Sequence, residues 1–142
     1  MTQPQAILVA DDDAAMRYLI SAILTGAGFK VDTAADGRQA YEGLQRDHYD
    51  LLVTDNEMPH LAGIGLIRQM RAAGMNLPVI IASGSFPEER VHDYQRLGIA
   101  AVVMKPFDFE DLLNAVRNAL EACSTTQPQA QGIYTGLQQV HG

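Results

Sequence analysis

Ile7-Leu8-Val9-Ala10 runs directly into Asp11-Asp12-Asp13, and two later apolar segments also end at charged side chains. Leu51-Leu52-Val53-Thr54 leads to Asp55, and Ala101-Val102-Val103-Met104 leads to Lys105. Runs of this length are typical of strands buried in a parallel sheet. Functional crevices of open α/β sheets lie beyond the carboxyl ends of the strands, so we expect these charged groups to meet at one sheet edge. Carboxylates and an ammonium gathered there suit a hard cation and an anion.

Apolar runs alternate with helix-period segments along the whole chain, which predicts βαβ units and a parallel sheet. Strands are expected at about residues 7–10, 29–34, 50–54, 78–82 and 99–104, and helices at about residues 14–26, 38–47, 64–73, 87–97 and 109–122. The Leu51-Leu52-Val53 run is continuous rather than alternating, so this strand should be central and covered on both faces. The expected fold class is therefore α/β.

The composition fits one compact domain, because the chain has 142 residues of which 47% are hydrophobic and 19% charged. We expect a flexible N-terminus at residues 1–5 and a folded domain at residues 6–122. Residues 123–142 are rich in Gln, Gly and Thr, which predicts a disordered tail. Cys123 is the only cysteine, which excludes an internal disulfide and a thiolate metal site.

The charge of the chain argues against nucleic acid as a partner. Its net charge is -7 and its pI is near 4.8, whereas electrostatic binding to phosphates needs clustered Lys and Arg. The sequence has neither an apolar run of about 20 residues, as a membrane-spanning helix requires, nor a signal-peptide pattern. We therefore expect a cytoplasmic protein that does not bind membranes.

Five short motifs lie at the ends of the expected strands: Asp11-Asp12, Asp55, Met58-Pro59, Ser83 and Lys105-Pro106-Phe107. Together they resemble the receiver domain of two-component response regulators. The resemblance covers residues 6–122, and it is specific because the motifs occur together and in the right order. It implies a flavodoxin-like, doubly wound parallel sheet of five strands in the order 2-1-3-4-5 with five helices. It also implies a phosphorylation-controlled switch that accepts a phosphoryl group from a histidine kinase or histidine phosphotransfer protein and then changes its binding to a downstream protein partner.

The residues themselves favour phosphoryl transfer. A carboxylate is a competent nucleophile for this reaction, and Asp55 stands alone after the most apolar strand, so it is the best candidate for the acceptor. Lys105 is a point charge suited to a phosphoryl oxygen, and the Ser83 hydroxyl can donate to another. These three residues are the expected catalytic set.

The expected cofactor is Mg²⁺, because phosphoryl transfer needs charge neutralisation and Mg²⁺ prefers oxygen ligands. Asp11 and Asp12 fit that task. By resemblance, Asp12 binds the metal directly and Asp11 partly through water, while Asp55 and the backbone carbonyl of Glu57 complete the protein ligands. Asp13 matches no ligand of the family and is expected to sit at a helix N-terminus, where a carboxylate is favoured. The histidines show no ligand spacing and are expected on the surface: His48, His60, His92 and His141.

Two positions depart from the family's pattern. Three residues before the lysine, receivers commonly carry an aromatic side chain that changes rotamer with phosphorylation, whereas this chain has Val102, which is stiff and has no ring. Phe86 and Tyr94 are the aromatic residues that could contribute to the coupling instead. The Asp-Gly often found after the acceptor is replaced here by Ala62-Gly63.

Two alternatives accompany this interpretation. The chain could be the receiver domain of a longer or hybrid signalling protein. It could also be a small metal-dependent phosphohydrolase with an aspartyl-phosphate intermediate, since such hydrolases carry a second acid two residues after the nucleophile and Glu57 occupies that position. Those hydrolases usually also carry a cap, for which five βα units in 142 residues leave no room. The receiver interpretation is therefore preferred, with no enzymatic role beyond the domain's own phosphorylation and dephosphorylation.

Overall fold

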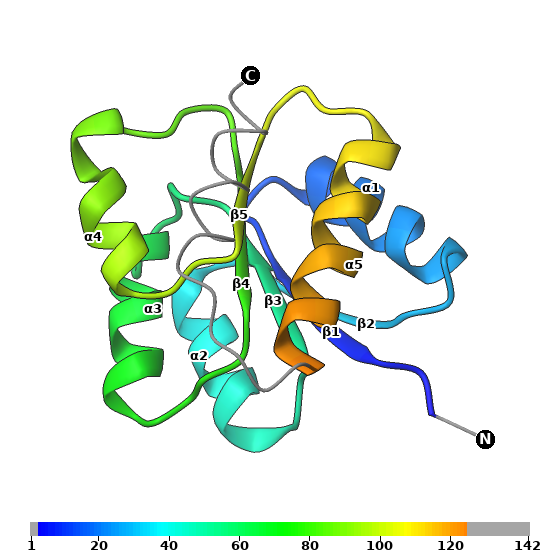
Figure 1. The fold of residues 1–142 in the computed structure, drawn as a ribbon, viewed down its shortest axis with the longest axis horizontal. Coiled ribbons are helices and arrows are strands. Elements are labelled where there is room, and N and C mark those ends of the chain that lie inside the picture. The colour runs from blue at the N-terminus through cyan, green and yellow to red at the C-terminus, as the bar shows by residue number, and fades with distance from the viewer. Residues whose placement is uncertain (1–2, 125–142) are drawn as a thin grey trace.

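In the computed structural model, which describes residues 3–124, a five-stranded parallel sheet forms the centre of the molecule (Figure 1). The strands lie in the order β2-β1-β3-β4-β5, and every neighbouring pair is parallel. The strands are β1 (Ala6–Ala10), β2 (Lys30–Ala34), β3 (Leu51–Thr54), β4 (Val79–Ser83) and β5 (Ala101–Met104). This order confirms the flavodoxin-like α/β architecture that the sequence predicts.

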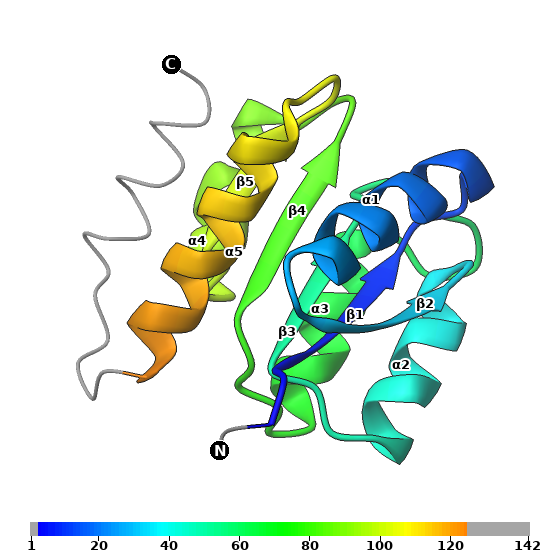
Figure 2. The same cartoon turned by 90° about the vertical axis from the view of Figure 1, so that its right-hand side faces the viewer.

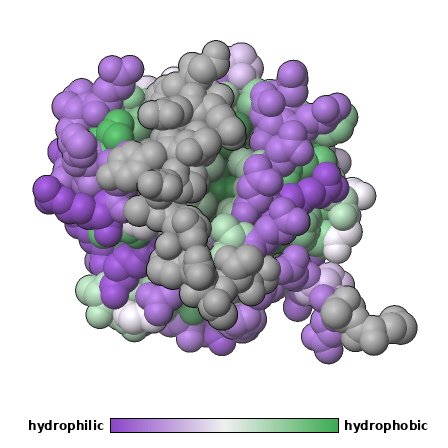
Figure 3. All heavy atoms as spheres, in the orientation of Figure 1, coloured by the Kyte–Doolittle hydropathy of each residue, from purple (hydrophilic) through white to green (hydrophobic). Residues whose placement is uncertain are grey.

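Helices cover both faces of the sheet, with α1 and α5 on one face and the other helices on the opposite face (Figure 2). The helical elements are α1 (Ala14–Gly26), α2 (Gly37–Arg46), α3 (Gly63–Ala72), the 3₁₀ turn η1 (Glu88–Arg90), α4 (Val91–Arg96) and α5 (Phe109–Ser124). Hydrophilic side chains gather on the outer surfaces of these layers in Figure 3. No helix in the described part of the chain is long and apolar enough to cross a membrane.

Two apolar cores lie on the two faces of the sheet, and β3 contributes to both. Leu52 packs with residues of α2, α3 and α4, whereas Leu51 and Val53 pack with residues of α1 and α5. All of β3 is buried, and it pairs with β1 on one side and with β4 on the other. The prediction that this continuous apolar run is a central strand is therefore confirmed.

Local sequence explains several helix ends. The Asp13 side chain caps α1 by accepting from the Ala15 and Met16 N–H groups, at 2.9 and 3.3 Å. The helix position expected for Asp13 is thus confirmed. Asp36 caps α2 by accepting from the Gln39 N–H at 2.8 Å. Gly98 follows α4 with φ +74°, a conformation that glycine adopts without steric cost.

The fourth helical segment differs from the expected single helix over residues 87–97. The Arg90 N–H donates to the Pro87 carbonyl three residues back, which is the 3₁₀ pattern, and α4 proper begins only at Val91. At the other end, the Ile99 N–H still donates to the Tyr94 carbonyl, so β5 begins at Ala101 rather than at residue 99. The helix α5 extends to Ser124, two residues beyond its expected end, and the tail expected to be disordered lies otherwise outside the described residues.

Because β3 carries both cores, we expect Leu52→Ala to lower the free energy of unfolding by about 2–5 kcal/mol. Leu52 is 0% exposed. Leu19→Ala is the matched control, since this leucine of α1 is 46% exposed, and its effect should stay within about 0.5 kcal/mol. Urea unfolding followed by circular dichroism measures both values, and equal effects would contradict the assignment of the core.

Candidate functional site

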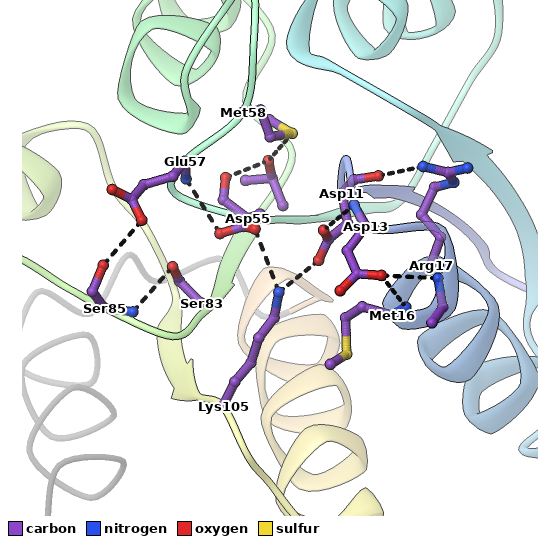
Figure 4. Close-up of polar contacts among 12 residues, drawn as sticks. Asp11, Asp13, Met16, Arg17, Asp55, Glu57, Met58, Ser83, Ser85 and Lys105 are labelled. Carbon is purple, nitrogen blue, oxygen red and sulfur yellow. Dashed lines mark hydrogen bonds and ion pairs between the residues drawn. The ribbon is translucent and has the colours of Figure 1, made fainter.

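The charged residues at the strand ends converge on one edge of the sheet (Figure 4). Lys105 follows β5, and its Nζ lies 2.7 Å from Asp11 Oδ2 and 3.4 Å from Asp55 Oδ2. Asp11 and Asp55 follow β1 and β3, so the lysine crosses β4 to reach Asp55 and both β4 and β3 to reach Asp11. The Lys105–Pro106 peptide bond is cis. The convergence expected from the apolar runs is therefore present in the fold.

Asp11, Asp12 and Asp55 form an acidic cluster in which the carboxylate oxygens lie within 4.8 Å of one another. Among residues 3–124 no other group of acidic, His or Cys side chains has this spacing. Three carboxylates around a small volume match the oxygen ligands that Mg²⁺ prefers. Glu57 lies next to the cluster, because its main-chain N–H donates to Asp55 Oδ1 at 3.2 Å. The donor set therefore fits a magnesium ion.

The three histidines in the described part of the chain are exposed and belong to no such group: His48, His60 and His92. Their expected place on the surface is confirmed. His141 lies outside the described residues.

Asp11 is buried, with an exposed fraction of 1%, and hydrogen bonds hold it in place. Its Oδ1 accepts from the Asp13 N–H at 2.9 Å, and its Oδ2 accepts from Lys105. The guanidinium of Arg17 donates to the Asp11 carbonyl at 2.7 Å and so fixes the main chain of the same residue. Sequence reasoning missed Arg17, for which the only signal is a cationic residue in the first turns of the helix that follows β1. These contacts orient one wall of the acidic cluster.

Burial and charge act in opposite directions at the Asp11–Lys105 pair. Burial raises the pKa of the Asp11 carboxyl above its ordinary value, and the hydrogen bonds from Lys105 and the Asp13 N–H oppose this rise without cancelling it. For Lys105, burial alone lowers the pKa, but Asp11 and Asp55 outweigh it and leave the pKa raised. The ammonium is therefore firmly protonated, whereas the acidic cluster would gain from a further cation.

The loops after β3 and β4 meet on the other side of Asp55. Ser83 is 1% exposed, and its Oγ accepts from the Ser85 N–H at 3.4 Å while its own hydroxyl can still donate. The Ser85 hydroxyl donates to Glu57 Oε1 at 3.2 Å, which bridges the two loops (Figure 4). Sequence reasoning did not single out Ser85, because the contact joins two loops 28 residues apart.

The backbone after Asp55 is packed too closely for a side chain at Gly63. A Cβ at this position would lie 2.6 Å from the Asp55 carbonyl oxygen, and the Gly63 N–H donates to the Asn56 carbonyl at 3.0 Å. Thr54, which is 0% exposed, donates its hydroxyl to the same Asp55 carbonyl at 3.0 Å. Glycine is therefore required at position 63, even though the residue before it is Ala62 rather than aspartate.

A family model described as the response regulator receiver domain matches residues 7–117. The chain belongs to this family. A receiver domain is a phosphorylation-dependent signalling module, so the match favours the switch over the phosphohydrolase alternative. Receiver domains bind Mg²⁺ at an acidic pocket and take phosphoryl groups from histidine kinases or phosphotransfer proteins.

Relatives and solved structures agree with the family match. The probable transcriptional regulatory protein SilR of Salmonella typhimurium is 36% identical over 127 residues, which cover 88% of this chain and 55% of SilR. The sporulation initiation phosphotransferase F of Bacillus subtilis is 28% identical over 116 residues, which cover 82% of this chain and 94% of that protein. The receiver domain of the Francisella response regulator 1452 has a TM-score of 0.78 at 30% identity, covering 84% of this chain and 99% of that one. The chemotaxis response regulator CheY4 of Vibrio cholerae has a TM-score of 0.76 at 27% identity, covering 82% and 99%.

This receiver chain spans about half the length of several curated relatives that it matches. It covers 55% of SilR and 51% of the response regulator MprA of Mycolicibacterium vanbaalenii. The regions that such relatives carry beyond the receiver domain have no counterpart in the match. The alternative of a receiver within a longer protein therefore stays open.

We expect Mg²⁺ to raise the melting temperature of this receiver domain and Asp12→Asn to abolish most of that rise. A cation that binds only the folded acidic cluster stabilises it by mass action, by about 2.7 kcal/mol at a hundredfold excess over Kd. Asp13→Asn is the matched control, because it removes a neighbouring charge outside the cluster and keeps a side-chain oxygen for the helix cap. Differential scanning fluorimetry with Mg²⁺ and with EDTA measures the rise, and equal responses of the two variants would contradict the site.

Proposed function

We propose that Asp55 is the phosphoacceptor of this receiver domain and takes its phosphoryl group from the phosphohistidine of a histidine kinase or phosphotransfer protein. The observation that carries the proposal is the contact of Asp55 with the ammonium of Lys105, whose Nζ lies 3.4 Å from Asp55 Oδ2 and 2.7 Å from the buried acid Asp11. A carboxylate oxygen of Asp55 attacks phosphorus, the phosphorus–nitrogen bond breaks, and its electron pair leaves with the imidazole of the donor.

The surrounding residues have separate tasks in this proposal. Asp11, Asp12, Asp55 and the main-chain carbonyl of Glu57 would hold Mg²⁺, which supplies charge neutralisation for the phosphoryl oxygens when bound. Lys105 donates to one phosphoryl oxygen, which requires it to exchange part of its contact with Asp11. The Ser83 hydroxyl donates to another oxygen from the opposite side of Asp55.

The domain limits and the partners also belong to the proposal. The receiver domain would comprise residues 6–122 and the last two residues of α5, which ends at Ser124. Phosphorylation would change the affinity for a downstream protein partner, in the cytoplasm and without nucleic-acid or membrane binding by this domain. The match to sporulation initiation phosphotransferase F, which covers 94% of that protein, supports phosphate relay as one form of that output.

We expect the wild-type chain to gain one phosphoryl group from acetyl phosphate in the presence of Mg²⁺ and Asp55→Asn to gain none. The reason is that the metal ligands and the donors Lys105 and Ser83 are all supplied by this chain, so a small donor suffices. Intact-mass spectrometry measures the uptake. Asp47→Asn, which removes an exposed acid at the far end of α2, is the control and should be labelled like the wild type. Equal labelling of Asp55→Asn would overturn the acceptor assignment.

We expect Glu57→Gln and Glu57→Lys to slow dephosphorylation by about tenfold, because in this proposal the Glu57 carboxylate orients the attacking water. The Ser85 hydroxyl holds this carboxylate at 3.2 Å, so Ser85→Ala should slow the reaction by a smaller factor. The measurement is the loss of phosphate over time after the donor is removed, at fixed Mg²⁺. Identical rates in the wild type and both Glu57 variants would show that only the main chain of this residue matters.

A further inference from the structure

The short helix α4 contacts the apolar core mainly through one buried side chain. Tyr94 is its only buried residue, with an exposed fraction of 1%, and the preceding turn η1 buries none. No side chain caps the N-terminus of α4, and Val91 and Leu97 pack against the core only as half-buried residues. The four longer helices each bury at least two residues. Arg71 of α3 holds the C-terminal end of α4 by donating to the Leu97 and Gly98 carbonyls at 2.7 and 3.3 Å, and Tyr94 is the buried contact between the helix and the core.

The polar end of Tyr94 contacts the loop that carries the phosphoacceptor. Its hydroxyl donates to Asn56 Oδ1 in a buried hydrogen bond, and Asn56 directly follows Asp55 in the chain. Burial raises the pKa of the tyrosine, so the hydroxyl remains a donor. A buried tyrosine hydroxyl that lost this partner would be left unsatisfied, which is unfavourable. The hydrogen bond therefore ties α4 to the residue next to Asp55.

The ring of Tyr94 contacts the second loop of the site. Phe86, three residues after Ser83, packs on Tyr94 with ring centroids 4.9 Å apart and an interplanar angle of 43°. Tyr94 thus contacts the loop after β3 through its hydroxyl and the loop after β4 through its ring. These are the two loops that the Glu57–Ser85 hydrogen bond also joins.

The position at which receivers commonly carry a mobile aromatic residue is filled by Val102, which is 0% exposed and packs in the same core as Phe86 and Tyr94. The β-branched valine has one stiff side-chain dihedral and cannot swing between two positions. A side-chain movement that couples the phosphorylation site to the rest of this domain must therefore involve residues other than Val102.

We propose that the Tyr94–Asn56 hydrogen bond couples α4 to the phosphorylation state of Asp55, an inference that rests on the function proposed above. The bond forms in the unphosphorylated domain. When Asp55 carries a phosphoryl group, the main chain of Asp55 and Asn56 shifts toward the new ligands, the Tyr94–Asn56 hydrogen bond breaks and α4 loosens. Because Gly63 packs directly against both residues, the loop cannot absorb that shift at Asp55 alone.

The coupling is reciprocal, since any contact that favours one state of a two-state element lowers the population of the other. Removing the tyrosine hydroxyl should therefore also favour the phosphorylated state. Tyr94→Phe retains the ring and its packing on Phe86, so the variant keeps its fold and loses only the hydrogen bond.

The test compares amide hydrogen exchange of residues 91–96 by NMR in the wild type and in Tyr94→Phe, with and without beryllium fluoride and Mg²⁺ as a phosphoryl mimic. In the wild type the mimic should speed exchange of α4 by about tenfold. In Tyr94→Phe exchange should already be fast, and the mimic should add less than about twofold. The variant should also bind beryllium fluoride about three to ten times more tightly than the wild type.

Tyr49→Phe is the matched control, because the buried Tyr49 donates a hydrogen bond to Asp32 at 2.6 Å outside the acceptor site. It should lose stability as Tyr94→Phe does but respond to the mimic like the wild type. An α4 response in Tyr94→Phe equal to that of the wild type, while intact mass shows phosphate on Asp55, would overturn the coupling and leave the proposed function standing. Failure of the wild-type chain to take up phosphate on Asp55 would overturn both.

Discussion

The ion pair between Asp11 and Lys105 is the constraint on which the rest of the site depends. A carboxylate that is 1% exposed is costly unless it is paired and hydrogen-bonded, and here the ammonium 2.7 Å away and the Asp13 N–H supply both. Lys105 follows β5 and Asp11 follows β1, which are separated in the sheet by β3 and β4. The pair therefore joins the ends of β1 and β5 across β3 and β4, and its ammonium also contacts Asp55.

The negative charge of the site exceeds its positive charge, and the proposed switch depends on this difference. One ammonium serves two acids, Asp11 and Asp55, while the exposed Asp12 adds a third carboxylate to the same cluster. A divalent cation and a phosphoryl group would together redistribute these contacts without new residues entering the site. In this proposal phosphorylation of Asp55 changes the charged contacts of Lys105 on the β5 side. It also changes the neutral Tyr94–Asn56 contact on the α4 side.

Much of the fold followed from local patterns, whereas the exceptions came from contacts between elements. The five apolar runs became strands in the expected places, and Asp13 lies at a helix N-terminus as expected, because capping involves residues only a few positions apart. The expected helix over residues 87–97 was wrong in its first turn, which is a 3₁₀ turn, because the segment buries no side chain before Tyr94. Local propensity could not reveal this, since it depends on how the segment packs.

The sequence by itself determined the fold class, the buried central strand and the charged residues at the strand ends, because these depend on periodicity and on neighbours along the chain. Only the tertiary structure decided which of those groups pair. Lys105 and Asp11 are 94 residues apart, and Tyr94 and Asn56 are 38 apart. Hydrogen bonds and ion pairs require their atoms to lie within a few ångströms of each other, and packing of helices against the sheet sets those distances. Residue spacing along the chain does not encode them.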